Sequence, residues 1–137
     1  MNRAARLFLV MGALSGATAV MAGAFGAHAI AESVTPERLA TFKTGAQYQL
    51  IHSLALLLVG IIVERLPSKV VQWSGRLFLA GVILFSGSLY ALVLVDLPAF
   101  GVITPFGGLA FICGWLLLAW GAWKAQAELS LPPQTES

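Results

Sequence analysis

Residues 44–63 have the sequence TGAQYQLIHSLALLLVGIIV, without a single aspartate, glutamate, lysine or arginine. An α-helix rises about 1.5 Å per residue, so about 20 residues are enough to cross the roughly 30 Å hydrocarbon core of a bilayer. Ten Leu, Ile and Val residues stand between Gln47 and Val63. Together they favour insertion by about 3 to 6 kcal/mol. The stretch therefore predicts a transmembrane helix, and it decides the class of the fold.

Three further stretches without charged side chains are long enough to span a membrane: Leu7–Ala31, Leu77–Val95 and Leu97–Trp123. Only Asp96 separates the last two, but Pro98 and Gly101 predict a turn after it, with the fourth helix beginning near Pro105. The sequence thus predicts an all-α fold. We expect a single domain, residues 1–125, that forms an integral membrane bundle of four transmembrane helices.

The composition agrees with this prediction, because 58% of the residues are hydrophobic and only 10% are charged. Soluble domains carry about 25% charged residues. The net charge of +2 is too small for a nucleic-acid-binding patch, so the expected partner is the lipid bilayer. The single cysteine, Cys113, excludes an intrachain disulfide and a multi-cysteine metal site. No hydrolase, metalloprotease or phosphate-loop motif is present, and we predict neither an enzyme nor a bound cofactor.

The positive charges predict how the bundle is oriented. Six of the eight lysines and arginines flank the ends of the predicted spans on one side: Arg3, Arg6, Arg65, Lys69, Arg76 and Lys124. The other two, Arg38 and Lys43, lie between the first and second spans. Because lysine and arginine are enriched on the cytoplasmic side of membrane proteins, both ends of the chain are predicted to lie in the cytoplasm. Residues 126–137, polar and rich in proline, are predicted to form a disordered cytoplasmic tail.

The connection at residues 31–43 carries the signature of a helix start. Thr35, Pro36 and Glu37 combine an N-cap residue, a proline at the first helical position and an acidic side chain in the first turn. We therefore predict a short interfacial helix between the first two spans, which either continues or bends near Gly45 into the second span.

The first span also resembles a secretory signal peptide. Arg3 and Arg6 precede an apolar run, and the small residues at 22–24 form a possible cleavage site. Against this interpretation, the apolar character continues beyond that site to Ile30. Both interpretations remain open from these residues alone.

Small residues recur at helical spacing in three of the predicted spans. In lipid, small side chains allow helix backbones to approach closely. The predicted packing residues are Gly12, Gly16, Gly23, Gly26, Gly87, Gly107, Gly114 and Gly121. They are expected to hold the bundle together, and the alternative is that some of them mediate homo-oligomers or contacts with another membrane protein.

With both chain ends in the cytoplasm, the polar residues of the four predicted spans are expected to lie in the outer half of the membrane. The members of this predicted cluster are His28, Gln47, Tyr48, Gln49, His52, Ser86, Ser88, Tyr90 and Thr104. A polar group without a hydrogen-bond partner in hydrocarbon costs several kcal/mol, on the order of 2 to 7, so each of these side chains needs a partner. The cluster is therefore either an interhelical hydrogen-bond network, a small site for a proton, a metal or a polar ligand, or a set of interfacial residues without a specific role. Two histidines without a carboxylate in the spans make a poor metal site.

Short motifs in all four predicted helices resemble those of the YgdD-like family of small bacterial membrane proteins, which has eukaryotic transmembrane relatives. The matching segments are GAFGAH at 23–28, FKTGAQYQ at 42–49, HSLA at 52–55, LFSGSLY at 84–90 and TPFGG at 104–108. The resemblance implies a multi-pass protein of the bacterial inner membrane and weighs against signal cleavage. It implies no catalytic or ligand-binding residues, because the family has no established molecular function.

Two functional hypotheses follow from the sequence. The first is a non-enzymatic structural or partner-binding membrane protein. The alternative is a small transporter or a proton- or ion-coupled element that uses His28, His52, Tyr48 and Tyr90.

Overall fold

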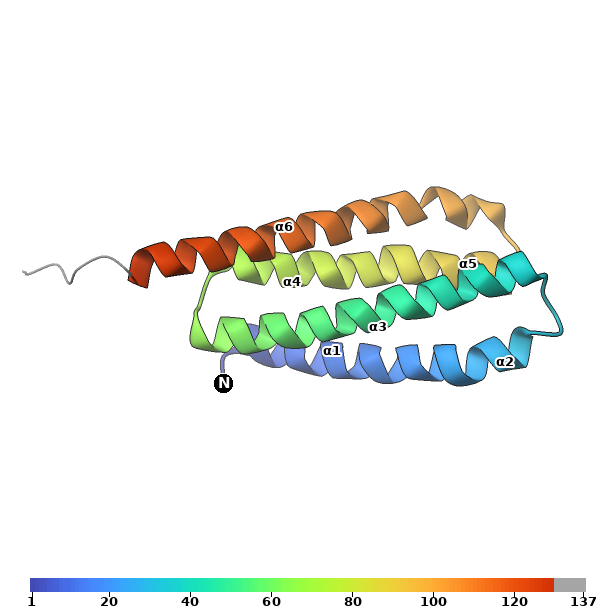
Figure 1. Ribbon diagram of the computed structural model, residues 1–137, viewed down its shortest axis with the longest axis horizontal. Coiled ribbons are helices and arrows are strands. Elements are labelled where there is room, and N and C mark those ends of the chain that lie inside the picture. Colours follow the sequence, from blue (N-terminus) through green and yellow to red (C-terminus); the bar gives the residue numbers. More distant parts are fainter. Residues whose placement is uncertain (130–137) are drawn as a thin grey trace, which may run out of the picture.

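The computed structural model describes residues 1–129, which fold into an elongated bundle of helices (Figure 1). In chain order these are α1 (Arg3–Met21), the π-helical turn η1 (Ala22–Gly26), α2 (Ala27–Ile30), α3 (Pro36–Arg65), α4 (Lys69–Gly81), the π-helical turn η2 (Val82–Ser86), α5 (Gly87–Leu94), the 3-10 helix η3 (Pro98–Val102) and α6 (Thr104–Leu129). Over the described residues there is no β-strand, and the all-α prediction is confirmed.

The two π-helical turns join their neighbouring helices without a break, so the bundle consists of four long helical segments, which we call rods. The rods are Arg3–Ile30, Pro36–Arg65, Lys69–Leu94 and Pro98–Ala125. Each is long and apolar enough to cross a membrane, as the uncharged stretches of the sequence predict. The fourth long helix, α6, begins at Thr104, next to the proline at which its start was predicted.

The predicted interfacial helix is part of α3. The hydroxyl of Thr35 accepts a hydrogen bond from the amide of Arg38, and Pro36 is the first helical residue, so the predicted N-terminus is present. α3 then continues through Gly45 to Arg65 as one helix of 30 residues, so of the two predicted arrangements the short helix continues into the second span without a bend at Gly45. A helix of this length extends about 45 Å, and its first turns can therefore project beyond the hydrocarbon core.

The C-terminal helix is longer than the predicted domain. α6 continues to Leu129, past the boundary predicted at residue 125. The rest of the predicted disordered tail, residues 130–137, lies outside the described residues.

The bundle has two ends with different chain connections. The N-terminus, the connection at residues 66–68 and the end of α6 lie together at what we call the terminal end (Figure 1). The connections at residues 31–35 and 95–103 lie at the opposite, distal end. Within the bundle α1 packs along α3, α6 packs along α4, and α3 also contacts α4 and α5. The α1 and α6 rods are therefore peripheral, and most of their residues remain exposed.

Aromatic side chains pack into spaces left by glycines in the terminal part of the core. Phe8 and Phe78 are fully buried, and each of their rings lies where a Cβ on a facing glycine would stand. An added Cβ would lie 2.7 Å from the Phe8 ring at Gly75 and 2.7 Å from the Phe78 ring at Gly114. The first, third and fourth rods can approach this closely because Gly75 and Gly114 carry no side chain.

The predicted packing glycines differ in how closely they meet a neighbouring helix. An added Cβ would come within 3.1 Å of a neighbouring atom at Gly12, Gly26, Gly107, Gly114 and Gly121. At Gly16 and Gly23 the nearest atom lies at an ordinary 3.7 or 3.8 Å, and at Gly87 it is the Val82 carbonyl of the same rod, 4.0 Å away.

Both ends of the bundle are fastened by polar contacts. At the terminal end, the Asn2 side chain accepts a hydrogen bond from the Ala5 amide and donates one to the Val63 carbonyl, 3.0 Å away. At the distal end, Arg38 forms an ion pair with Asp96. Asp96 has a φ of 57°, a left-handed conformation that aspartate tolerates better than most residues.

Candidate functional site

Gln49 is the centre of a hydrogen-bond network that joins three of the rods. Its side chain is buried on α3. The Nε2 atom donates to the Ser15 carbonyl at 3.0 Å and to the Thr18 hydroxyl at 2.8 Å, both on α1. The Oε1 atom accepts from the Tyr90 hydroxyl on α5 at 2.7 Å. Both donors of the amide and its carbonyl oxygen are therefore satisfied inside the protein.

Ser53, one helical turn after Gln49, extends this network along the same face of α3. Its hydroxyl is fully buried and donates to the Gln49 carbonyl at 2.6 Å. It also lies 2.7 Å from the Ser15 hydroxyl of α1. Residues four apart share one helix face, so Gln49 and Ser53 together fasten α3 to α1.

His52 points to a different side of α3 and forms a second polar group. The imidazole is only 4% exposed. Its Nε2 lies 3.2 Å from the indole Nε1 of Trp115, and its Nδ1 lies 2.7 Å from the Tyr48 carbonyl. Because an indole N–H can only donate, Nε2 must accept, and the proton is then on Nδ1, which donates to the carbonyl. Both ring nitrogens of the neutral imidazole are occupied.

The His52 ring is enclosed by aromatic side chains from three rods. It stacks on Phe111 of α6, with ring centroids 3.4 Å apart and 9° between the ring planes. Phe78 of α4 and Tyr48 of α3 lie with their centroids 5.6 and 6.0 Å away. The aromatic rings and the indole donor leave no open direction toward a ligand at this side chain.

Ser88 and Thr104 form a third polar group, at the start of α6. Their hydroxyls lie 2.7 Å apart. Each hydroxyl has one proton, so one of the two donates to the other; the Ser88 Oγ also lies 2.9 Å from the Phe85 carbonyl, and the Thr104 Oγ1 lies 3.4 Å from the Phe100 carbonyl. This pair fixes the position at which the chain returns from η3 into α6.

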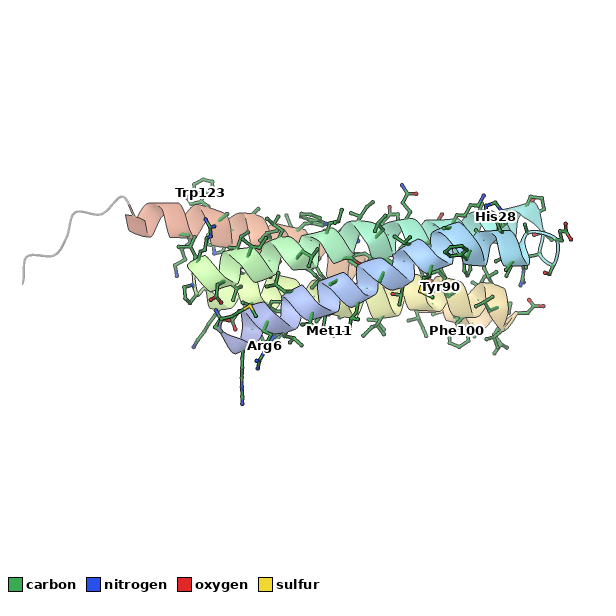
Figure 2. The ribbon with its side chains drawn as sticks, turned by 90° about the horizontal axis from the view of Figure 1, so that it is seen from below. Arg6, Met11, His28, Tyr90, Phe100 and Trp123 are labelled. Atoms are coloured by element: carbon green, nitrogen blue, oxygen red, sulfur yellow. The ribbon has the colours of Figure 1, made fainter. Side chains whose placement is uncertain are left out.

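The side chains of the remaining predicted cluster residues form no hydrogen bond with these groups, although the Tyr48 carbonyl and ring contact His52. His28 lies near the distal end of the bundle (Figure 2), exposed on α2, whereas His52 is buried. Gln47 is exposed, and Tyr48 is 40% exposed, with its ring against Phe85. The nine predicted residues therefore do not surround one site, and the two histidines are separated.

Ser86 ends the second π-helical turn with a buried hydroxyl that has no hydrogen-bond partner among the described residues. Ser74, on α4, likewise has a buried hydroxyl without a hydrogen-bond partner among the described residues. Turns of π-helix often mark functional positions, and here η1 and η2 overlap in part with the motif segments at 23–28 and 84–90. These features are the ones that an interhelical packing network does not explain.

The predicted cluster lacks several members of the observed groups, among them Ser15, Thr18, Phe111 and Trp115. Ser15 and Thr18 stand among small residues of the first span, where the spacing of the glycines predicts close helix packing and not a hydrogen-bond network. A signal was available, since Ser15 lies three residues after Gly12 on the face predicted to pack. Phe111 and Trp115 had no comparable signal, because aromatic residues are common on lipid-exposed faces.

No group of three or more His, Cys, Asp or Glu side chains comes together among the described residues. A cavity exists elsewhere, at the terminal end of the bundle, and it shares no residue with the polar groups above.

The chain is similar to bacterial membrane proteins over most of its length. Residues 22–108 match the family model described as "Protein of unknown function (DUF423)". A UPF0382 membrane protein of Staphylococcus aureus (strain bovine RF122) is 44% identical over 119 residues, which cover 87% of this chain and 97% of the relative. The UPF0382 membrane protein YwdK of Bacillus subtilis is 38% identical over 120 residues, covering 87% of this chain and 98% of the relative. No solved structure matches the chain.

Proposed function

The chain belongs to the DUF423 family, whose members are membrane proteins of unknown function, and from this premise we propose that it is a non-enzymatic membrane protein that acts as a structural or partner-binding component. Its polar side chains hold the helices together, and its exposed helix faces meet lipid and partners.

The observation that carries the proposal is that both ring nitrogens of His52 already have hydrogen-bond partners inside the protein. A proton carrier or a metal ligand needs a nitrogen atom that is open to its cargo. In His52 one nitrogen accepts from Trp115 and the other donates to a backbone carbonyl. Gln49 is likewise saturated by α1 and α5. This supports a structural role for the predicted cluster.

Purified protein in proteoliposomes tests the proposal. Fluxes of protons, common divalent metals and small polar solutes are measured for the wild type and for His52→Leu, together with the unfolding of both proteins in detergent. We expect flat wild-type traces and a destabilised His52→Leu. A wild-type flux that disappears in a well-folded His52→Leu protein would contradict the proposal.

The alternative function, a small transporter or a proton- or ion-coupled element, is favoured by one set of observations. Two rods contain π-helical turns, and Ser86 in one of them has a buried hydroxyl without a partner among the described residues. The same flux measurement on Ser86→Ala decides between the two functions. Loss of a wild-type flux in this variant would support the transporter.

The relatives are labelled membrane proteins, which supports a location in a membrane. Our proposal is a multi-pass protein of the bacterial inner membrane, and the excess of lysine and arginine at the terminal end supports both chain ends in the cytoplasm. The narrower resemblance to YgdD-like proteins remains part of this proposal. The peripheral α1 and α6 rods, largely exposed in a single copy, are the surfaces on which homo-oligomers or another membrane protein would pack.

A further inference from the structure

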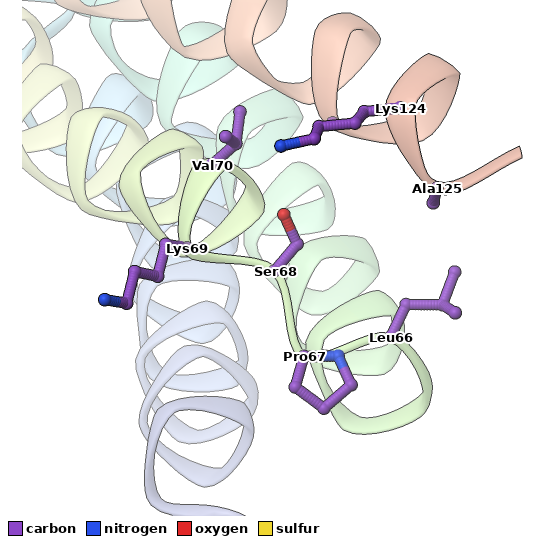
Figure 3. Close-up of a pocket in the computed structure, with 8 residues that line it drawn as sticks. Leu66, Pro67, Ser68, Lys69, Val70, Lys124 and Ala125 are labelled. Carbon is purple, nitrogen blue, oxygen red and sulfur yellow. The ribbon is translucent and has the colours of Figure 1, made fainter. Parts of the chain in front are cut away.

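A cavity of about 460 Å³ opens at the terminal end of the bundle, between the connection that joins α3 to α4 and the last turns of α6 (Figure 3). Its lining residues are Leu66, Pro67, Ser68, Lys69, Val70, Gly121, Lys124 and Ala125. One part of this lining is apolar, while Ser68 and the two lysines are polar. A cavity of this composition suits a ligand that carries a negative charge on an apolar body.

Lys124 is the cation best placed for such a ligand. Figure 3 shows its side chain extending from α6 toward the first turn of α4, near Ser68 and Val70. Lys69 also lines the cavity but points to the other side of that turn. Lys124 can therefore contact a bound anion directly, whereas Lys69 contributes mainly to the local positive potential.

The first turn of α4 adds backbone donors to this cation. The Ser68 hydroxyl accepts from the Val71 amide at 3.5 Å, so it caps one amide of the helix start. The amides of the first helical residues have no partner within a helix. Those of Lys69 and Val70 belong to residues that line the cavity. A helix start also carries a partial positive charge and binds phosphate groups well.

Gly121 brings α6 close to this helix start. An added Cβ would lie 2.6 Å from Cγ2 of Val71, so the cavity keeps its shape only with a glycine at this position. The helix amides and Lys124 consequently approach the same space from two rods.

Since the four rods are long enough to cross a membrane, we expect their ends, and the cavity with them, to lie at the depth of the lipid headgroups. Lys69 begins the third rod, and Lys124 stands at the end of the fourth. A soluble phosphate would use the charged part of the cavity and leave the apolar walls at Leu66, Pro67 and Ala125 unused. A phospholipid places its phosphate and its glycerol backbone side by side at this depth, and it would contact both parts.

We propose that this terminal-end cavity binds the headgroup of an anionic phospholipid, with Lys124 and the first amides of α4 holding the phosphate and the apolar residues contacting the glycerol region. The site requires only that the chain spans the membrane, so it does not depend on the function proposed above.

Native mass spectrometry of the full-length protein in neutral detergent tests the proposal. Retained lipid is measured after addition of phosphatidylglycerol or of zwitterionic phosphatidylcholine. We expect wild type to retain phosphatidylglycerol preferentially, and Lys124→Gln to reduce this affinity about fivefold, since one cation near an anionic lipid contributes on the order of 1 kcal/mol. Arg6→Gln is the matched control, because it removes one exposed cation at the same end but outside the cavity.

A second variant tests the cavity without changing its charge. Ala125→Leu narrows the apolar wall in the last turns of α6 and is expected to weaken phosphatidylglycerol retention, with circular dichroism confirming that the protein is folded. An equal effect of Lys124→Gln and Arg6→Gln would overturn the proposal, because it would indicate diffuse attraction only. Displacement of phosphatidylglycerol by millimolar inorganic phosphate would also overturn it and identify a site for the soluble anion.

Discussion

At the scale of the residue, the imidazole of His52 shows how a polar side chain is accommodated inside an apolar bundle. Its two nitrogens have opposite roles, one accepting from an indole and one donating to a carbonyl. This pairing requires the neutral ring with its proton on Nδ1, because a proton on Nε2 would place an N–H donor against the indole N–H donor of Trp115. The contact with Trp115 therefore selects one tautomer.

The tautomer can be observed directly, because the chain has only two histidines. In long-range ¹H–¹⁵N spectra of labelled protein in micelles, we expect His52 to show the pattern of the Nδ1–H form at neutral pH. A His28→Asn variant assigns the signals. Trp115→Phe removes the indole donor, and the shift of His52 Nε2 should then change, whereas Trp120→Phe, on an exposed position of the same helix, should leave it unchanged. An Nε2–H pattern in the wild type would contradict the assigned network.

Gln49 offers a second test at this scale, with a neighbour as its control. Gln49→Leu removes the bonds to the Ser15 carbonyl, Thr18 and Tyr90. Interhelical hydrogen bonds in membranes contribute roughly 0.6 to 1.7 kcal/mol each, so we expect the loss of these three to lower the free energy of unfolding by about 2 to 5 kcal/mol. Gln47→Leu, at an exposed position, should have little effect. Unfolding by denaturing detergent in mixed micelles measures both variants, and equal stabilities would contradict the importance of the network.

At the scale of the element, the closest approach of α6 to the third rod is set by Gly107. An added Cβ there would lie 2.3 Å from the backbone nitrogen of Phe85, an atom that cannot move without shifting η2. At the adjacent Gly108 the nearest atoms belong to the Phe85 ring and lie 3.8 Å away. These two positions in one helix therefore differ in what a methyl group would meet.

Gly107→Ala is expected to lower the free energy of unfolding by about 1 to 3 kcal/mol, as overpacking does when the neighbouring backbone must shift. Gly108→Ala should be neutral or slightly stabilising, because alanine favours the helix by up to about 1 kcal/mol. Unfolding in mixed micelles gives both values. A Gly107→Ala protein as stable as wild type would show that α6 and η2 do not pack as closely as described.

The elements also show where sequence reasoning stops. The four rods follow from uncharged length alone, and Thr35 and Pro36 predicted the start of α3 because capping chemistry is local. The π-helical turns were not predicted, since an i→i+5 turn has no side-chain signature of its own. The polar cluster was predicted from the depth of each residue along its helix, but depth does not fix the rotation of a helix. His52 and Gln49, three residues apart, consequently belong to different hydrogen-bond groups.

At the scale of the whole molecule, the charges and the polar groups divide the bundle between its two ends. Arg38 and Lys43 stand near the distal end, while the other lysines and arginines flank the terminal end. Arg38 is moreover paired with Asp96, which reduces the positive charge that the distal end presents. The count of six lysines and arginines against two favours a cytoplasmic terminal end.

Cysteine labelling of intact cells tests this orientation. In a Cys113→Ser background, which removes the one native thiol, a single cysteine is placed at Ser33 in the distal connection or at Pro67 in the terminal connection, both exposed. A membrane-impermeant maleimide should label the Ser33→Cys protein on intact cells and the Pro67→Cys protein only after the cells are opened. The opposite pattern would reverse the orientation, and labelling of both variants on intact cells would indicate insertion in both directions. Either result would place the lipid-binding cavity in the outer leaflet for some or all copies, since that cavity and Pro67 lie at the same end of the bundle.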